Sequence, residues 1–512
     1  MSTAEIKHFL QDLLPAVNFE SDFLFTELDS LGIATILYAL SEKYKVHFDI
    51  EDVTPRNIKS IEAITKMVRS KMSLENKIRH FSIATPDKVA LICGDDSMTY
   101  SQLWDAIVSK AAALREGGLQ AHRGYVYRTN QDMDFIITYC AVHFVNAVAV
   151  PLGHTVTDEE FEVVRQEVDS YVFPDDVADT LFTTGTTGKS KGVMLSHASL
   201  TSSSENFLDR FPFSQDLCFI VSGPLNHIAT LHKINPTLCT GGTVCIIDGI
   251  KDMNAFFKAF DLPFEKFATF LVPASLRIIM QYSYEKLRSL SSKISFIETG
   301  AAPITRADME KLSKALPGTR LYNGYGATEF GSAASYDFND GKYMEGCIGR
   351  PFKNAIIEID SEGRIVVSGA GVMSGYINDG ENTKNVLADG KVHTSDLGFF
   401  DEEGMIHLTG RAGEVINIGG YKINPIEVEN TASSFPGIRD CICVSAKHPV
   451  IGLVLKLVVA LRPGATFDKH DLAMFIKTKL EAYKVPTMYE VVDAIKYTYN
   501  GKKDRKSYRE NG

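Results

Sequence analysis

The first seventy positions of the chain carry a helical pattern of apolar residues. Apolar side chains recur at intervals of three and four, and therefore on one helical face, at Ile6, Phe9, Leu10, Leu13 and Leu14. Two further stretches, residues 31–40 and 61–68, are also typical of apolar helices. We predict a small helical bundle over residues 1–72, and we interpret the polar run 69–77 as a linker.

From residue 88 onward the pattern changes to short, β-branched runs separated by helical stretches. These runs occupy residues 88–93, 147–151, 243–248, 268–273 and 294–298. The alternation predicts an α/β body with buried, largely parallel strands. The longest apolar stretch, Phe135 to Pro151, is short for a membrane span and is better read as a buried helix running into a buried strand.

The pattern changes again toward the C-terminus. Two runs of residues, 355–360 and 364–369, flank turn residues and predict a β-hairpin. From about residue 414 to the end, the chain carries strands and helices of its own and finishes with a basic segment. We therefore expect a third region, separate from the α/β body.

Composition and charge narrow the function without deciding it. Hydrophobic residues make up 45% and charged residues 23% of 512 positions, which is typical of a globular protein. The 53 basic and 64 acidic residues give a net charge of −11, which argues against nucleic acid as a partner. The N-terminus lacks the basic and apolar segments of a secretory signal, and eight scattered cysteines without a C-x-x-C pair predict neither disulfides nor zinc. We expect a cytoplasmic protein without a membrane span.

The strongest local motif is LFTTGTTGKSKG, residues 181–192. Glycines allow backbone N–H groups to converge, threonine hydroxyls add donors and a lysine adds positive charge, a combination that binds polyphosphate. The segment fails the Walker pattern because position 183 is Thr where that pattern needs Gly. The alternative is a surface loop rich in Gly and Thr without a function.

A second motif is NGYGATEF, residues 323–330. It fails the dinucleotide fingerprint G-x-G-x-x-G because Glu329 stands at the third glycine position. Tyr325 could stack on a purine, Thr328 could donate a hydrogen bond to a phosphate, and Glu329 could hold a divalent ion. An ordinary turn is the alternative.

These two motifs, followed by the segments 393–404, 410–429 and 500–506, resemble the adenylate-forming superfamily of acyl-CoA synthetases, adenylation domains and luciferases. The resemblance covers about residues 75–510. It implies a large α/β N-terminal body over 75–410 and a small, mobile α+β subdomain over 411–512.

Residues 25–53 resemble an acyl or peptidyl carrier protein, which makes residues 1–72 a carrier domain. That resemblance implies a 4′-phosphopantetheine group on Ser30, attached by a phosphopantetheinyl transferase. The alternative for Ser30 is an ordinary residue at the start of a helix.

The superfamily resemblance implies ATP and Mg²⁺ as cofactors and assigns roles to residues of its motifs. The β- and γ-phosphates would lie against Thr183, Thr184, Gly185, Thr186, Thr187, Gly188 and Lys191. The adenine side would be formed by Gly300, Ala301, Ala302, Pro303, Asn323 and Tyr325.

The remaining nucleotide contacts follow from the same resemblance. Thr328 would reach the α-phosphate, and Glu329 would ligate Mg²⁺. Asp396 would accept hydrogen bonds from both ribose hydroxyls, and Arg411 would contact the same nucleotide. Lys502 would bridge the attacking carboxylate and the α-phosphate.

Three further positions bear on the substrate and on the motion that the resemblance implies. His227 corresponds to a residue beside the acyl pocket, where it would orient the substrate; a buried structural histidine is the alternative. Gly413 stands at the pivot between the two half-reactions, where the superfamily usually has Asp or Lys. Residues 226–229 lack the aspartate that binds the ammonium of an α-amino acid, so we expect an aryl or aliphatic acid.

Three functions remain open from the sequence. The favoured one is a ligase that activates a carboxylic acid as acyl-AMP and loads it on a carrier, in cis or in trans, and most simply on the chain's own Ser30. The second is an acyl-CoA ligase that uses free coenzyme A. The third is a carrier-presenting scaffold without activity, against which Asp396, Arg411 and Lys502 argue.

Overall fold

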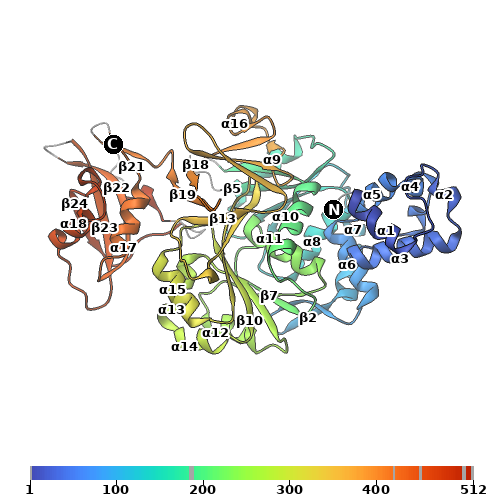
Figure 1. The fold of residues 1–512 in the computed structure, drawn as a ribbon, viewed down its shortest axis with the longest axis horizontal. Helices are drawn as coiled ribbons and strands as arrows, with labels where there is room; N and C mark the ends of the chain where they lie inside the picture. Colours follow the sequence, from blue (N-terminus) through green and yellow to red (C-terminus); the bar gives the residue numbers. More distant parts are fainter. Residues whose placement is uncertain (1–2, 184–189, 419–420, 449–451, 499–502, 509–512) are drawn as a thin grey trace. The chain divides into compact units, whose positions relative to one another are not determined.

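The chain forms two compact units in the structure, a computed structural model that describes residues 3–183, 190–418, 421–448, 452–498 and 503–508. One unit contains residues 1–269 and 373–380, and the other contains residues 270–372 and 381–512. Figure 1 shows the elements of both units in sequence colours.

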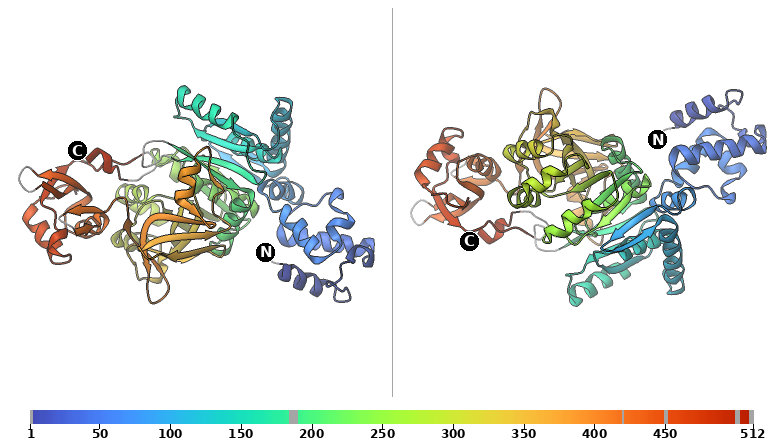
Figure 2. Two further views of the ribbon diagram at one scale, coloured as in Figure 1. Left: turned by 90° about the horizontal axis from the view of Figure 1, so that it is seen from above. Right: turned by 90° about the horizontal axis from the view of Figure 1, so that it is seen from below.

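The first unit begins with a group of helices, blue in Figure 1 and grouped together in both views of Figure 2. They are α1 (Thr3–Leu13), α2 (Leu24–Glu27), α3 (Ser30–Tyr44), α4 (Pro55–Ile58) and α5 (Ile61–Ser70), with a short 3₁₀ turn at Ile50–Asp52. Their buried faces form one cluster, which includes Ile6, Leu10, Ile36, Leu40 and Ile64. The predicted helices are confirmed, and each buries several of the apolar positions that its period indicated. Leu13 and Leu31 are exceptions, because both are exposed.

The predicted linker over residues 69–77 is wrong. Helix α6 (Leu74–Ala84) starts inside it, capped by the Ser73 hydroxyl, which accepts a hydrogen bond from the Asn76 backbone N–H at 3.3 Å. Glu75 and Lys77 look like surface residues but are buried. Glu75 contacts His143 at 3.1 Å, so its charge is compensated by a side chain from a distant segment.

The rest of the first unit is α/β. One five-stranded sheet has the order β16-β6-β5-β4-β3, with parallel pairs among β3, β4 and β5 and an antiparallel pair β5–β6. Its strands are β3 (Gly124–Thr129), β4 (Val148–Gly153), β5 (Val177–Thr183), β6 (Lys191–Ser196) and β16 (Gly375–Tyr376). A second set of strands comprises β1 (Val89–Cys93), β2 (Asp96–Thr99), β7 (Leu217–Val221), β8 (Thr243–Ile246) and β9 (Lys266–Phe270). In that set β1, β8, β7 and β9 pair in parallel, as predicted.

Helices connect these strands. They are α7 (Tyr100–Glu116), α8 (Met133–Phe144), α9 (Asp158–Asp169), α10 (His197–Arg210), α11 (Ile228–Cys239) and α12 (Met253–Lys258). The apolar stretch Phe135 to Pro151 is helix α8 followed by strand β4, which confirms the predicted buried helix and strand.

The second unit contains the remaining strands of the body. They are β10 (Ile294–Gly300), β11 (Arg320–Ala327), β12 (Gly331–Asp337), β13 (Cys347–Pro351), β14 (Ala355–Ile359), β15 (Arg364–Gly369), β17 (Leu387–Ala388), β18 (Lys391–Phe400) and β19 (Ile406–Arg411). Its helices are α13 (Pro273–Tyr282), α14 (Tyr284–Ser289), α15 (Arg306–Ala315) and α16 (Gly380–Val386). The predicted hairpin is confirmed as β14–β15, which pair antiparallel from Ala355↔Gly369 to Ile359↔Ile365.

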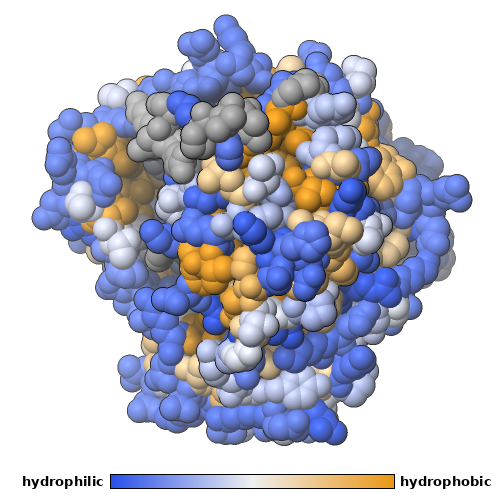
Figure 3. All heavy atoms as spheres, turned by 90° about the vertical axis from the view of Figure 1, so that its left-hand side faces the viewer, coloured by the Kyte–Doolittle hydropathy of each residue, from blue (hydrophilic) through white to orange (hydrophobic). Residues whose placement is uncertain are grey.

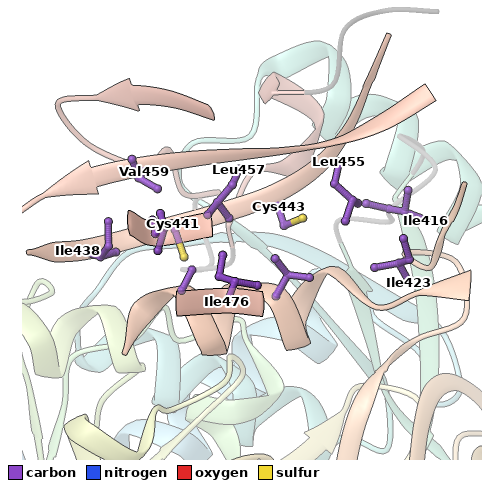
Figure 4. Close-up of a cluster of buried hydrophobic side chains, with 12 residues drawn as sticks. Ile416, Ile423, Ile438, Cys441, Cys443, Leu455, Leu457, Val459 and Ile476 are labelled. Carbon is purple, nitrogen blue, oxygen red and sulfur yellow. The ribbon is translucent and has the colours of Figure 1, made fainter. Parts of the chain in front are cut away.

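The C-terminal part of the second unit has strands and helices of its own, as predicted, and they enclose a separate core. After β20 (Ile416–Ile418) and β21 (Tyr421–Ile423), the three strands β22 (Ile438–His448), β23 (Gly452–Leu461) and β24 (Met488–Val492) form a separate sheet. Helices α17 (Pro425–Ser433) and α18 (Lys469–Lys477) complete the layer beside it. Figure 4 shows apolar side chains from sheet and helix facing one another, including Leu457 and Ile476.

Across the described residues, no helix combines the length and the apolar composition needed to cross a membrane. On the face seen in Figure 3, hydrophilic side chains predominate and hydrophobic ones are scattered among them.

Candidate nucleotide site

Two neighbouring strands of the second unit bring the predicted adenine-side residues together. Strands β10 and β11 run parallel, and their last pair joins Gly300 to Gly324. A Cβ atom added to Gly300 would lie 2.7 Å from the carbonyl oxygen of Gly324, so this close approach requires glycine. The next residue, Ala301, is exposed and has a φ of 64°, an uncommon left-handed conformation for a residue other than glycine. Such strain is concentrated at ligand-binding loops.

Asp396 is the centre of a hydrogen-bonded group in the same unit. The hydroxyl of Tyr325 on β11 donates to Asp396 Oδ2 at 2.8 Å, and Arg411 Nε donates to Asp396 Oδ1 at 2.7 Å. Asp396 and Arg411 are cross-strand neighbours on β18 and β19. The structure therefore brings together three residues that the resemblance assigned to one nucleotide.

Burial and charge act together on this group. Burial raises the pKa of the Tyr325 hydroxyl well above its usual value, and the adjacent Asp396 raises it further, so the phenol stays a donor. Burial alone would lower the pKa of Arg411, but Asp396 raises it above its usual value. Each carboxylate oxygen has a second lone pair, which can accept a hydrogen bond from a ligand hydroxyl.

Asn323, Thr328 and Glu329 lie on or just after the same strand. Asn323 Nδ2 donates to the carbonyl oxygen of Cys347 at 2.9 Å, so its amide is partly used within the protein. Thr328 and Glu329 are half-buried in the turn between β11 and β12. Their predicted roles toward phosphate and Mg²⁺ stay predictions.

The residues present fit Mg²⁺ if the nucleotide supplies the other ligands. Among the described residues, no group of three or more His, Cys, Asp or Glu side chains could hold a metal ion. Mg²⁺ keeps several waters and is bound by one or two carboxylates together with substrate phosphates. Glu329 would then be the protein ligand, and the ion would offset phosphate charge.

The two ends of the motif at 181–192 lie on paired strands of the first unit. Strands β5 and β6 pair antiparallel, with Thr183 opposite Lys191. The hydroxyl of Ser190 donates to the carbonyl oxygen of Thr183 at 2.7 Å, and Lys191 Nζ lies 5.0 Å from the ring centroid of Tyr376. The predicted phosphate contacts at 184–188 lie outside the described residues.

His227 and Gly413 occupy the ends of secondary-structure elements. His227 is the N-cap residue of α11 and is half-buried. Gly413 follows β19 in a turn, and among the described residues an added Cβ there would meet no heavy atom within 4 Å. Its φ lies outside the left-handed region, so this conformation does not itself require glycine.

The basic C-terminal segment is more buried than its composition suggests. Lys502 lies outside the described residues, but Lys503 and Arg505 are mostly buried in ion pairs with Glu429. Sequence reasoning missed these contacts. One feature of the sequence could have indicated a buried carboxylate here. The segment IEVEN, residues 426–430, has two acidic residues alternating with apolar ones, so a helix that packs its apolar side against the core brings one of them close to that core.

Comparisons with known proteins place most of the chain in one enzyme family. Residues 79–173 and 162–377 match the AMP-binding enzyme family, and residues 427–502 match the AMP-binding enzyme C-terminal domain. Residues 1–78 lie outside both matches, and the comparisons give no support to a carrier domain there.

Individual relatives cover most of the chain. A feruloyl-CoA synthase from Amycolatopsis sp is 30% identical over 475 residues, which cover 82% of this chain and 94% of that protein. An oxalate–CoA ligase from Arabidopsis thaliana is 26% identical over 500 residues, covering 85% and 96%.

Among solved structures, ATP-bound MatB from Rhodopseudomonas palustris has the same fold, with a TM-score of 0.77 and 23% identity over 85% of this chain and 99% of that one. The match to the AMP-binding enzyme family spans more than half of the chain. The feruloyl-CoA synthase is 30% identical to this chain, and the alignment covers 94% of that relative. The chain therefore belongs to the AMP-binding enzymes of the adenylate-forming superfamily, as an AMP-forming enzyme of the carboxylate–CoA ligase type that adenylates a carboxylic acid with ATP.

Proposed function

We propose that this enzyme is an acyl-CoA ligase for an aryl or aliphatic carboxylic acid. In the first half-reaction the carboxylate attacks the α-phosphorus of ATP, pyrophosphate leaves and acyl-AMP forms. In the second, the thiol of coenzyme A attacks the acyl carbonyl, AMP leaves and the thiol proton is released. The relatives described above as CoA synthase and CoA ligase support coenzyme A as the acceptor.

The hydrogen-bonded position of Asp396 is the observation that carries this proposal. A buried carboxylate between Tyr325 and Arg411 offers two free acceptor directions, which suit the adjacent hydroxyls of a ribose. Thr328, together with Lys191 and residues 183–188, would bind the phosphates. These groups would act mainly by positioning two anions that repel each other.

Lys502 and the small subdomain complete the proposed cycle. Lys502 would bridge the substrate carboxylate and the α-phosphate during adenylation and would withdraw when the subdomain rotates about Gly413. His227 would orient the acid. Asn226, which stands in the segment where α-amino-acid enzymes have an aspartate, supports an acid without an ammonium group.

Acid-dependent pyrophosphate exchange tests the first half-reaction, and thioester formation with coenzyme A tests the second. We expect exchange with at least one member of an aryl and aliphatic acid panel, and a CoA thioester from the same acid. Exchange without any CoA thioester would contradict the acceptor. Asp396→Asn should reduce exchange on the order of tenfold or more, since it removes the charge from the ribose contact.

A second candidate function is loading of the acyl group on a carrier domain formed by residues 1–72. In this proposal residues 75–410 form the adenylating body and residues 411–512 form the small subdomain. The N-terminal helices have a core of their own, and Ser30 is exposed at the first residue of α3, where Asp29 caps the helix by accepting from the Gly32 N–H at 2.7 Å. An exposed hydroxyl of this kind fits a 4′-phosphopantetheine attachment site.

Intact mass measurement after incubation with a phosphopantetheinyl transferase and coenzyme A tests this candidate. A phosphopantetheine adduct that is lost in Ser30→Ala, and an acyl adduct on it after addition of ATP and acid, would support carrier loading. Mixing Ser30→Ala with Asp396→Asn distinguishes loading in trans from loading in cis. An unmodified Ser30 would leave the CoA ligase as the function.

A further inference from the structure

Glu429 joins the end of the chain to the core of the C-terminal subdomain. It lies on α17, and its side chain is 5% exposed. Its Oε1 accepts a hydrogen bond from the backbone N–H of Cys443 at 2.8 Å and another from Arg505. Its Oε2 accepts from Lys503 Nζ at 3.3 Å. One buried carboxylate therefore binds a core strand and two residues of the C-terminal segment.

Both basic residues have further partners around Glu429. Lys503 Nζ also lies 3.2 Å from Asp440 and donates to a backbone carbonyl of β22. Arg505 Nε donates to Glu414 at 3.1 Å, and Arg505 Nη1 donates to the carbonyl oxygen of Cys443 at 2.9 Å. Removal of one partner would leave buried charges uncompensated, so these contacts restrict the segment strongly.

The charges favour this arrangement. Burial alone would lower the pKa of Lys503, but Glu429 and Asp440 raise it above its usual value. The same balance applies to Arg505, where burial opposes and Glu429 raises the pKa. Lys503 and Arg505 therefore stay charged within the subdomain.

The backbone before and after the proposed catalytic lysine is also held. Tyr497 and Lys503 form an antiparallel bridge, and the N–H of Asp504 donates to the carbonyl oxygen of Lys496 at 2.9 Å. The hydroxyl of Tyr497 donates to Asp440. These anchors lie on both sides of the segment 499–502, which is outside the described residues.

We infer that Glu429 is a positioning residue for the adenylation half-reaction, acting on Lys502 through its contacts with Lys503 and Arg505. This inference rests on the proposed role of Lys502. Lys503, whose side chain and backbone are both held, follows Lys502 directly in the chain. Rates of reactions between bound groups depend steeply on such placement, with losses of about a hundredfold for displacements near 1 Å.

The test is Glu429→Gln in the full-length enzyme, measured separately in the two half-reactions. Gln keeps an acceptor for Cys443 but removes the charge that holds the C-terminal segment. We expect acid-dependent pyrophosphate exchange to fall on the order of tenfold to a hundredfold. Thioester formation from supplied acyl-AMP should stay within about threefold, because it does not use Lys502 but does need a folded small subdomain.

Glu427→Gln is the matched control. Glu427 lies on the same helix and pairs with Lys484 at 2.8 Å, and its contacts do not include the C-terminal segment among the described residues. The same change of charge there should leave exchange within about twofold of the unaltered enzyme.

A double variant makes the inference sharper. If Glu429 acts through Lys502, Glu429→Gln should have almost no further effect on exchange in a Lys502→Ala background. Fully additive losses, an equal fall in both half-reactions, or unchanged exchange in Glu429→Gln would each overturn the inference. If Lys502→Ala itself leaves exchange unchanged, the proposed role of Lys502 is wrong and the inference falls with it.

Discussion

Tyr325 and Asp396, 71 positions apart in the chain, are joined by a hydrogen bond of 2.8 Å from the phenolic hydroxyl to the carboxylate. Arg411 holds the other carboxylate oxygen at 2.7 Å. Because both oxygens are fixed, the carboxylate cannot rotate freely, and its remaining acceptor directions are set before a nucleotide binds.

Tyr325→Phe tests this preorganisation. The substitution removes the donor and keeps the ring, and hydrogen bonds to charged groups contribute about 1.5–3 kcal/mol. We expect the KM for ATP in pyrophosphate exchange to rise about tenfold. Tyr336→Phe is the control, because Tyr336 donates to Asp340 at 2.9 Å outside this group. Equal effects of the two variants would argue against a nucleotide role for Tyr325.

Gly300→Ala tests the close approach of β10 and β11. The new Cβ would lie 2.7 Å from the backbone oxygen of Gly324, which cannot move without shifting the strand. We expect ATP binding, measured by calorimetry, to weaken on the order of tenfold, because the adjacent loop shifts with the strand. Gly318→Ala is the control, since its nearest contact is an ordinary 3.7 Å. Tight ATP binding by Gly300→Ala would contradict the placement of the adenine side.

His143 provides a test of pH dependence in the first unit. It is buried between Glu75 at 3.1 Å and Asp179 at 2.7 Å, and Tyr139 donates to the same aspartate at 2.8 Å. His197 lies close by, with a ring centroid separation of 5.5 Å. Burial alone would lower the pKa of His143, but Asp179 and Glu75 raise it to about 10.

A raised pKa in the folded state gives stability that is complete below the unfolded value and is lost as the pH rises toward 10. Between about pH 7 and about pH 9.5, we therefore expect the free energy of unfolding to fall by about 2–3 kcal/mol from this group. Urea unfolding of wild type and His143→Gln at both values measures it. His143→Gln should have a lower free energy of unfolding than wild type at neutral pH, and that free energy should fall less between the two pH values. An equal fall in wild type and variant would show that His143 does not cause the pH dependence.

Gly413→Ala tests whether the proposed rotation of the small subdomain requires glycine at residue 413. The described surroundings leave space for a Cβ, and φ is not left-handed. We therefore expect the free energy of unfolding to change by less than about 0.5 kcal/mol and the rate of pyrophosphate exchange to stay within about twofold of wild type. Thioester formation should slow if the rotated state uses dihedral angles that favour glycine. If Gly413→Ala and wild type have the same rate in each half-reaction, glycine is not needed at this pivot.

The sequence by itself predicted most of the elements and the family, although it missed helix α6, which begins inside the predicted linker. The helical period over residues 1–70, the β-branched runs and the predicted hairpin at 355–369 depend on neighbouring residues, so local patterns predicted them correctly. The motifs at 181–192 and 323–330 likewise carry their chemistry in short segments, and the family match agrees with them.

The tertiary structure alone decided which charged residues are buried. Glu75 was interpreted as part of a polar linker, yet it pairs with His143, 68 positions away. Lys503 lies in a basic segment, yet it pairs with Glu429, 74 positions away. Glu75 and Lys503 are buried because another segment supplies a counter-charge, and the residues next to them in the chain carry no information about that partner.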